Sequence, residues 1–258
     1  MALEQLDMES GLNKEDYAIQ LLKTWEPLEG YYLGFSGGVD SQIIYDLAKR
    51  AKVKFDAHYN VSPIDPPQVY KFIRDYYPDV IWDYHAKGFW KLVVKNDLPL
   101  RIQRWCCRII KEVGGDNRVV VVGNRADEST RRKHQCFIDV PNILTIKQKN
   151  HNRTILRPIL KFTNFDRWQY MLKYKLVHNP LYDMGYERVG CVLCPYSSDK
   201  DKQIKDFPKI VNLWKLACDK IVQSYKDREY LTKRGKPMVF KPQTGEELFN
   251  WWVYGKRI

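Results

Sequence analysis

An apolar run that breaks into paired glycines constrains this fold more than any other feature of the sequence. Residues 31–36 predict a buried strand, and Ser-Gly-Gly-Val-Asp-Ser occupies positions 36–41. Adjacent glycines adopt backbone angles that other residues avoid, so successive amide N–H groups can converge on an anion at the start of a helix, where the helix dipole favours negative charge. The segment therefore predicts a phosphate-binding loop between a strand and a helix.

The polar side chains of this loop suit a nucleotide. Ser36 and Ser41 add hydroxyl donors to the amides of Gly37 and Gly38. Asp40 offers a carboxylate for Mg²⁺ at the first turn of the helix. The alternative is an ordinary strand-to-helix turn, because such turns commonly use glycine, serine and aspartate.

The surrounding pattern favours the phosphate-binding loop. An apolar helical face and a second strand follow it, and this alternation continues as far as residue 133 before it loosens. We expect strands at 31–36, 53–60, 79–83 and 118–123, and helices at 14–25, 41–51, 66–77, 87–95, 104–113 and 127–133. Such alternation predicts an α/β fold, in which a twisted parallel sheet carries helices on both faces.

In a sheet of this kind, ligands bind at the carboxyl ends of the strands. Asn60 ends the second expected strand at that edge, so we include it among the nucleotide ligands. Along the chain we expect an N-terminal helical segment at 1–30, a nucleotide-binding domain at 31–195 and a helical C-terminal segment at 196–258.

The strand, loop and helix together resemble the PP-loop of the ATP pyrophosphatase superfamily. The resemblance implies an adenine nucleotide alpha hydrolase-like fold. It also implies the superfamily's activity, which is to cleave ATP between its α and β phosphates or to bind adenylyl sulfate. The loop does not match the Gly-Lys-Ser/Thr signature of ordinary nucleoside triphosphatases, so hydrolysis of the γ-phosphate is not expected.

Four of the six cysteines fall into two short motifs. Cys106 and Cys107 are adjacent, and Cys191 and Cys194 form a Cys-x-x-Cys that proline follows. Four thiolates complete one metal shell, and a Cys-x-x-Cys-Pro turn is familiar around iron–sulfur clusters, whereas structural zinc usually takes two Cys-x-x-Cys knuckles. We therefore expect a 4Fe–4S cluster, with zinc, a redox dithiol and unconnected core thiols as the alternatives.

With these cysteines, the chain resembles the cluster-bearing members of the PAPS (phosphoadenylyl-sulfate) reductase family, the adenylyl-sulfate reductase type. Residues 123–129 resemble the family's Gly-x-Arg-x-x-Glu-Ser segment, and 178–185 resemble the segment that leads into the second cysteine pair. The resemblance implies that Arg125, Glu128 and Arg157 bind the nucleotide, a task for which the guanidinium fork suits arginine. The alternative for Arg125 and Glu128 is a surface ion pair at a helix start.

The resemblance also implies a nucleophilic cysteine in a mobile C-terminal tail, which this sequence does not match. After Cys194 it contains only Cys218, on the apolar face of a helix expected near 210–222, where we expect a structural role. Cys136 follows the basic run 131–134 and is the candidate reactive thiol, because nearby cations lower the pKa of a thiol.

The charge balance indicates anionic partners. Lysine and arginine number 43 against 31 aspartate and glutamate, which gives a formal net charge of +12. The basic residues are spread over more of the sequence than one nucleotide pocket needs, so a nucleic-acid or tRNA acceptor is a candidate partner. The alternative is a solvated, lysine-rich surface without a polymer partner.

Without that tail cysteine, the resemblance to the PP-loop superfamily implies an ATP pyrophosphatase that adenylates an acceptor, and that releases pyrophosphate before sulfur from a donor displaces AMP. Mg²⁺, Asp40, the loop amides and Arg125 would supply most of the catalysis by positioning and charge neutralisation. One alternative is a sulfite-forming adenylyl-sulfate or phosphoadenylyl-sulfate reductase, which draws on a thiol reductant protein. Another is a non-catalytic, nucleotide-gated iron–sulfur regulator that binds nucleic acid.

The sequence also bounds the location of the protein. No apolar run is long enough to span a bilayer, and residues 1–16 are polar and acidic. We expect a cytoplasmic enzyme without a membrane partner, and a homo-oligomer remains open. The five histidines show no metal-ligand spacing.

Overall fold

The computed structural model describes residues 3–6, 11–85, 88–141, 152–226 and 242–255. The chain forms two compact units. The first, which we call the sheet unit, comprises Met1–Asn60, Pro67–Asp83 and Val113–Val189. The second, which we call the cysteine unit, comprises Val61–Pro66, Tyr84–Glu112 and Gly190–Ile258.

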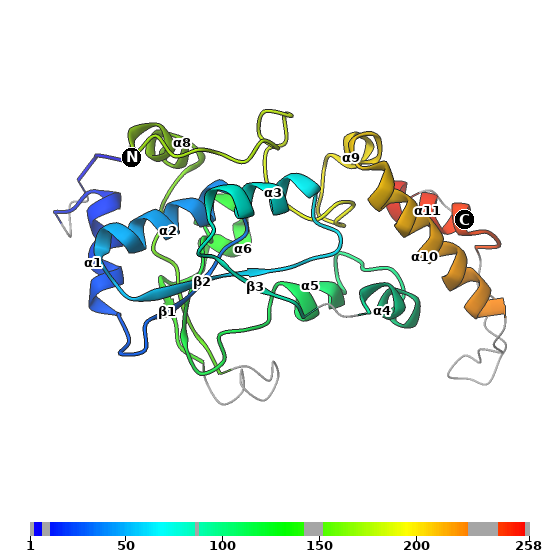
Figure 1. Cartoon of the computed structure of the whole chain (residues 1–258), viewed down its shortest axis with the longest axis horizontal. Coiled ribbons are helices and arrows are strands. Elements are labelled where there is room, and N and C mark those ends of the chain that lie inside the picture. The colour runs from blue at the N-terminus through cyan, green and yellow to red at the C-terminus, as the bar shows by residue number, and fades with distance from the viewer. Residues whose placement is uncertain (1–2, 7–10, 86–87, 142–151, 227–241, 256–258) are drawn as a thin grey trace. The chain divides into compact units, whose positions relative to one another are not determined.

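A six-stranded sheet organises the sheet unit (Figure 1). Its strands are β1 (Tyr31–Gly34), β2 (Phe55–Asn60), β3 (Ile81–Asp83), β4 (Val119–Val121), β5 (Ile138–Asp139) and β6 (Thr154–Leu156), in the order β3-β2-β1-β4-β6-β5. All neighbouring pairs are parallel except β5 and β6, which are antiparallel. Chain order reverses between β1 and β4, so the carboxyl ends of these two strands form the switch point at which such sheets bind ligands.

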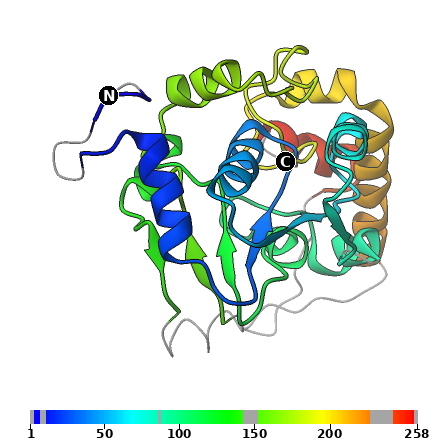
Figure 2. The same ribbon diagram turned by 60° about the vertical axis from the view of Figure 1, so that its left-hand side comes forward.

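Helices flank this sheet. They are α1 (Lys14–Thr24), α2 (Val39–Ala51), α3 (Pro67–Tyr76), α6 (Thr130–Lys133) and α8 (Asn164–Lys173), with a 3-10 turn η1 (Ala126–Glu128). Helix α2, light blue in Figure 2, packs against α1 and α8. Ile43, Ile44 and Leu47 of α2 are fully buried, and burial of each such side chain stabilises the fold by about 1.5–3 kcal/mol. The Tyr170 hydroxyl of α8 donates to Asp46 of α2 at 2.6 Å, which ties the two helices together.

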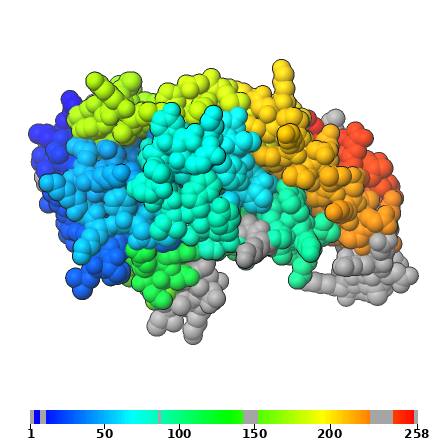
Figure 3. Space-filling view, in the orientation of Figure 1, coloured from blue at the N-terminus to red at the C-terminus, as the bar shows by residue number. Residues whose placement is uncertain are grey.

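The cysteine unit is helical, with α4 (Phe89–Asn96), α5 (Trp105–Ile110), α9 (Lys200–Asp206), α10 (Pro208–Lys226) and α11 (Gly245–Tyr254). Helix α10 packs against α4, α9 and α11. Trp214 of α10 is almost fully buried, and its ring centroid lies 5.1 Å from Trp90 and 4.7 Å from Trp252. These indoles form an aromatic core for the unit. Figure 3 shows the solvent-facing side of α10 in gold to orange.

The mostly parallel sheet with flanking helices confirms the predicted α/β fold class. Two local features differ from expectation. Strands β5 and β6 occupy a region in which the sequence pattern loosens, and the helix expected at 127–133 divides into η1 and α6. The division occurs because Ser129 is extended, with φ of −171°, and its hydroxyl caps α6 by accepting from the Arg132 amide.

The expected division at residues 30 and 195 stays a prediction, because packing units need not coincide with segments of the sequence. None of the helices in the described part of the chain is both long enough and apolar enough to cross a membrane.

Candidate active site

The loop between β1 and α2 lies at the switch point of the sheet. Gly37 has a left-handed φ of +72°, and a Cβ added there would approach Cγ1 of Ile73 to 3.3 Å. The loop is held from a distant segment: Asn179 Nδ2 donates to the Gly37 carbonyl at 3.3 Å, and the Tyr182 hydroxyl accepts from the Val39 amide at 3.0 Å. The backbone of the loop is therefore fixed before any ligand binds.

The two serines of the loop contact each other. Ser36 Oγ donates to Ser41 Oγ at 3.3 Å, and Ser41 Oγ donates to the Gly38 carbonyl at 2.7 Å. Gly38 is the N-cap residue of α2 and has no side chain with which to cap it. The first amides of α2 therefore depend on partners from elsewhere, and the helix dipole makes this end suited to an anion.

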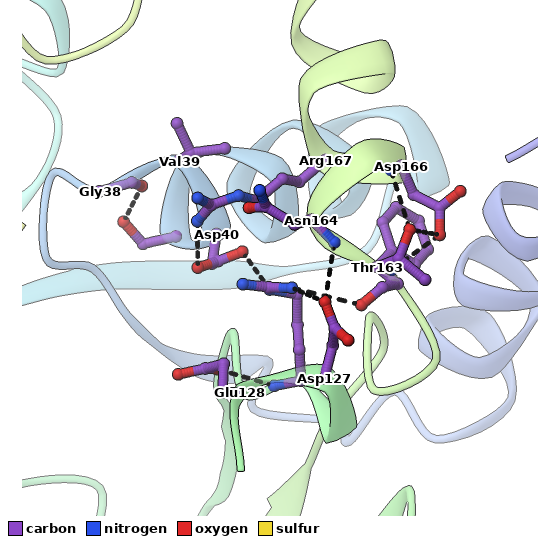
Figure 4. Close-up of polar contacts among 12 residues, drawn as sticks. Gly38, Val39, Asp40, Asp127, Glu128, Thr163, Asn164, Asp166 and Arg167 are labelled. Atoms are coloured by element: carbon purple, nitrogen blue, oxygen red, sulfur yellow. Dashed lines mark hydrogen bonds and ion pairs between the residues drawn. The ribbon is translucent and has the colours of Figure 1, made fainter. Parts of the chain in front are cut away.

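Two arginines share the carboxylate of Asp40, in the first turn of α2 (Figure 4). Arg125 Nε donates to Oδ1 at 2.7 Å, and Arg167 Nη1 donates to Oδ2 at 3.4 Å. Arg125 is 5% exposed and Arg167 6% exposed. Burial raises the pKa of Asp40 above its usual value, although the two guanidinium groups act against it. Two buried cations thus converge on one carboxylate beside the loop.

Gly123 allows β4 and α2 to meet. A Cβ at this position would lie 3.0 Å from the carbonyl carbon and oxygen of Asp40. Two residues later, the Arg125 amide donates to Glu128 Oε1 at 3.0 Å, and Glu128 also pairs with Arg132. Glu128 thus forms its ion pair with Arg132, near the start of α6, whereas the Arg125 side chain forms its ion pair with Asp40.

Two other expected ligands have partners of their own. Arg157, which follows β6, donates from Nη1 to the Cys136 carbonyl at 2.9 Å and from Nη2 to Asp139 Oδ2 at 3.4 Å. Asn60, which ends β2, donates to the Val113 carbonyl at 3.3 Å. Neither side chain makes a hydrogen bond to the phosphate loop within the described residues, so nucleotide binding by these two stays a prediction.

Three residues of this site escaped the sequence analysis: Arg167, Asn179 and Tyr182. Asn179 and Tyr182 lie in the segment that resembles the family pattern, and Asn179 is fully buried. An asparagine before a proline is common in turns, so the sequence carries no sign that these side chains reach the loop. Arg167 belongs to an amphipathic helix, on which a single arginine is usually a solvated residue.

The four paired cysteines all belong to the cysteine unit. Cys106 and Cys107 lie in the first turn of α5, and Cys191 and Cys194 lie in a turn before α9. The Cys194 amide donates to the Cys191 carbonyl at 3.3 Å. Sγ of Cys191 lies 3.8 Å from the hydroxyl oxygen of Ser62.

The turn between Cys191 and Cys194 has an unusual backbone. Leu193 has a left-handed φ of +58°, which is uncommon for a residue with a branched side chain. The Leu193 amide donates to Oε1 of Gln203 at 2.8 Å, and Gln203 is a buried residue of α9. A side chain of the following helix therefore fixes the shape of this turn.

The thiols of this unit influence one another's protonation. A hydrogen bond from Cys106 lowers the pKa of Cys107 to about 7. The same hydrogen bond, burial, and repulsion by Cys107, Cys191 and Cys194 raise the pKa of Cys106. Burial and the nearby Asp65 carboxylate raise the pKa of Cys191. Cys106 therefore lies within electrostatic reach of the other three thiols.

Their placement is not that of a closed metal site. No group of three or more His, Cys, Asp or Glu side chains among the described residues could hold a metal ion. Thiolates are nevertheless the ligands of iron–sulfur clusters, and a metal's positive charge would relieve the repulsion that raises the pKa of Cys106. The donor set fits a cluster in its chemistry.

The two remaining cysteines differ in access. Cys136 is exposed on the turn after α6. Cys218 lies on α10 with no exposed surface, and burial, with repulsion by Asp219, raises its pKa to about 12. A buried thiol with a raised pKa is a poor nucleophile, which argues against Cys218, and a reactive Cys136 stays a prediction.

Comparison with known sequences gives a family match over most of the chain. The family described as the phosphoadenosine phosphosulfate reductase domain matches residues 30–197. Uncharacterized protein MJ0066 of Methanocaldococcus jannaschii is 26% identical over an alignment of 246 positions that covers 86% of this chain and 49% of that protein. An adenosine 5'-phosphosulfate reductase of Bacillus cytotoxicus is 26% identical over 163 residues, 61% of each chain. The chain spans about half the length of the first of these relatives and three fifths of the second.

Comparison with solved structures finds a reductase from a yeast. The crystal structure of phosphoadenylyl-sulfate reductase from Candida auris, in a phosphate complex, gives a TM-score of 0.49 at 18% identity, over 71% of this chain and 90% of that chain. Similarity at this level supports no inference about function.

Proposed function

Because the chain belongs to the phosphoadenosine phosphosulfate reductase family, we propose that it binds an adenine nucleotide at the N-terminus of α2 and uses ATP to adenylate an acceptor for sulfur transfer. The observation that carries this proposal is the pair of buried guanidinium groups, from Arg125 and Arg167, that converge on Asp40 beside the loop. Buried cations at a helix N-terminus that a glycine loop precedes suit a polyphosphate.

Nucleotide binding at this site is an exchange of partners. A phosphate group presents several anionic oxygens, so it can take both guanidinium groups from the single carboxylate of Asp40. Asp40 is then free to serve as an oxygen ligand, and it is the residue that we assign to Mg²⁺. When bound there, Mg²⁺ would supply charge neutralisation at the phosphates.

The proposed reaction forms a bond between an acceptor oxygen and the α-phosphorus of ATP and breaks the bond from that phosphorus to the β-phosphate oxygen. Pyrophosphate leaves with the electron pair, and a sulfur donor later displaces AMP from the activated acceptor. Arg125 and Arg167 would bind the charge that develops on the leaving pyrophosphate, and the fixed loop would hold the phosphates in line. Because burial excludes water from both arginines, each contact gains strength.

We assign Cys106, Cys107, Cys191 and Cys194 as the ligands of a 4Fe–4S cluster. Their thiolate chemistry supports this assignment, as does their common membership of one unit. When bound, such a cluster would supply electrons or sulfur. The sulfur donor, the oligomeric state and the cytoplasmic location remain predictions.

A second candidate function is reduction of adenylyl sulfate or phosphoadenylyl sulfate to sulfite. The Bacillus relative named as a reductase favours it. A reductase needs a thiol that attacks sulfur, and Cys218 is too deeply buried for this role. The exposed Cys136 or the thiol of a separate reductant protein would have to supply the nucleophile.

Calorimetric titration separates the two candidates. The full chain, purified without oxygen, is titrated with ATP and Mg²⁺, with adenylyl sulfate and with phosphoadenylyl sulfate. We expect the tightest binding for ATP with Mg²⁺, and weaker binding of it by an Arg167→Gln variant than by the exposed control Arg74→Gln. Preference for either sulfate ester would overturn the adenylating function in favour of the reductase.

A further inference from the structure

An exposed tyrosine in the cysteine unit contacts two arginines. Tyr196 is 49% exposed, and its ring centroid lies 5.1 Å from Cζ of Arg104 and 5.9 Å from Cζ of Arg101. Both distances fall within the range of cation–π contacts. The ring therefore has guanidinium groups beside it while much of its surface faces solvent.

Two backbone contacts fix this arrangement. The Tyr196 hydroxyl donates to the Arg101 carbonyl at 2.8 Å, and Arg101 Nε donates to the Pro195 carbonyl at 2.9 Å. These two hydrogen bonds tie the segment around Arg101 to the segment around Tyr196. The ring and the Arg101 side chain are therefore ordered by local contacts. Ile102, between the two arginines, is 99% exposed, which places this loop at the surface.

Positive charge here is not neutralised by acidic neighbours. Among the described residues, no carboxylate forms an ion pair with Arg101, Arg104 or Lys200, although other arginines of the chain are paired. Burial and repulsion by Arg101 lower the pKa of Lys200, whose ammonium group donates to the Val253 carbonyl. The tyrosine therefore lies in an electropositive setting that a polyanion would complement.

We propose that Tyr196, Arg101 and Arg104 form a platform on which a base of a single-stranded nucleic acid stacks while the arginines bind its phosphates. An exposed ring beside arginines that form no ion pair with a described carboxylate suits sequence-tolerant binding of single strands. A base within a duplex is already stacked on its neighbours, so the exposed part of the Tyr196 ring selects unpaired bases.

This platform deepens the proposed function and rests on it, because it names the class of acceptor. Arg104 precedes Cys106 by two residues, and Tyr196 follows Cys194 by two residues. The platform residues therefore adjoin both cysteine pairs in the sequence. An acceptor base stacked on Tyr196 would be held beside those thiols.

Fluorescence anisotropy with a labelled oligouridylate of about 12 nucleotides tests the platform on the full chain without ATP. We expect Tyr196→Ala to weaken binding at least about fivefold and Tyr196→Phe, which keeps the ring, to bind within about twofold of the parent. The double variant Arg101→Gln/Arg104→Gln should flatten the slope of log affinity against log salt by about 1.4, the effect of two lost phosphate contacts on a single strand.

The matched control removes two exposed lysines of the same unit, in Lys205→Gln/Lys209→Gln. The proposal is overturned if this control weakens binding as much as the arginine variant, if Tyr196→Ala binds like the parent, if a duplex of equal length binds as tightly, or if the parent does not bind. Because no ATP is present, failure here is distinct from failure of the adenylating function, which the calorimetric titration measures.

Discussion

Asp40 and Arg167 are 127 positions apart in the sequence, and Oδ2 of the first lies 3.4 Å from Nη1 of the second. This contact joins the first turn of α2 to α8, and it brings a second buried cation to the carboxylate that Arg125 already holds. The phosphate loop thus has two arginines beside it, one from the end of β4 and one from a helix late in the chain.

Removal of the Asp40 carboxylate should strengthen binding of a metal-free phosphate anion. In Asp40→Asn, both guanidinium groups lose their charged partner, so pyrophosphate no longer competes with a carboxylate for them. We expect the affinity for pyrophosphate in the presence of EDTA to rise about tenfold. Isothermal titration measures this. Asp127→Asn, which removes an exposed carboxylate 3.6 Å from Arg125, is the control. A fall in pyrophosphate affinity in Asp40→Asn would contradict the exchange of partners.

With ATP and Mg²⁺, by contrast, the same variant should lose catalytic activity. We expect Asp40→Asn to lose most pyrophosphate release from ATP, because an amide is a weaker Mg²⁺ ligand than a carboxylate. A coupled assay of released pyrophosphate measures this. Full turnover by Asp40→Asn would remove Asp40 from the metal-binding role.

Arg167 should contribute to nucleotide affinity through its guanidinium group. We expect Arg167→Gln to weaken binding of ATP with Mg²⁺ by roughly 10- to 100-fold, the range for loss of charge-assisted hydrogen bonds. Because Arg167 is buried, a thermal melt must first show that the variant folds. Arg167→Lys keeps the charge without the fork and should recover only part of the affinity. Parental affinity in Arg167→Gln would exclude the residue from the site.

Glu15 should make folding sensitive to acid. Burial raises its pKa, but hydrogen bonds from Tyr174 and Arg50 outweigh burial and lower it below the usual 4.5. A carboxylate with a lowered pKa in the folded state stabilises the protein above the unfolded-state pKa, and this contribution is lost as the pH falls through the folded-state pKa. We expect Glu15→Gln to reduce the free energy of unfolding by about 2 kcal/mol at neutral pH, and the difference to shrink in acid.

Urea unfolding at neutral and acidic pH measures this difference. Glu4→Gln is the control, because Glu4 also pairs with Lys173 but its side chain is 76% exposed. A difference between Glu15→Gln and the parent that stays constant as the pH falls below about 4 would show that the carboxylate charge is not its source.

Iron content should depend on the paired cysteines and not on the others. We expect Cys191→Ser, purified without oxygen, to lose most iron and visible absorption, because a serine hydroxyl is a poor ligand for a soft metal centre. Cys136→Ser should keep both, since Cys136 belongs to the sheet unit. Unchanged iron in Cys191→Ser would show that the cluster assignment is wrong.

The strand, loop and helix at 31–51 could be predicted because glycine chemistry and apolar periodicity are local properties. Strands β5 and β6 could not, because they are two and three residues long and show no periodicity. Arg167 and Tyr182 reach the loop from helices and turns whose own sequences specify only local structure. Their side-chain roles arise from tertiary packing, which a single sequence does not encode at any one position.

The left-handed backbone at Leu193 links the second cysteine pair to the helical end of the chain. A non-glycine residue in this conformation is disfavoured by about 1–2 kcal/mol, and the hydrogen bond to Gln203 of α9 offsets it. The distance between the Cys191 and Cys194 thiols therefore depends on the packing of α9. If the proposed cluster binds these thiols, its binding and the packing of α9 would be cooperative, and a change that destabilises α9 would also weaken cluster binding.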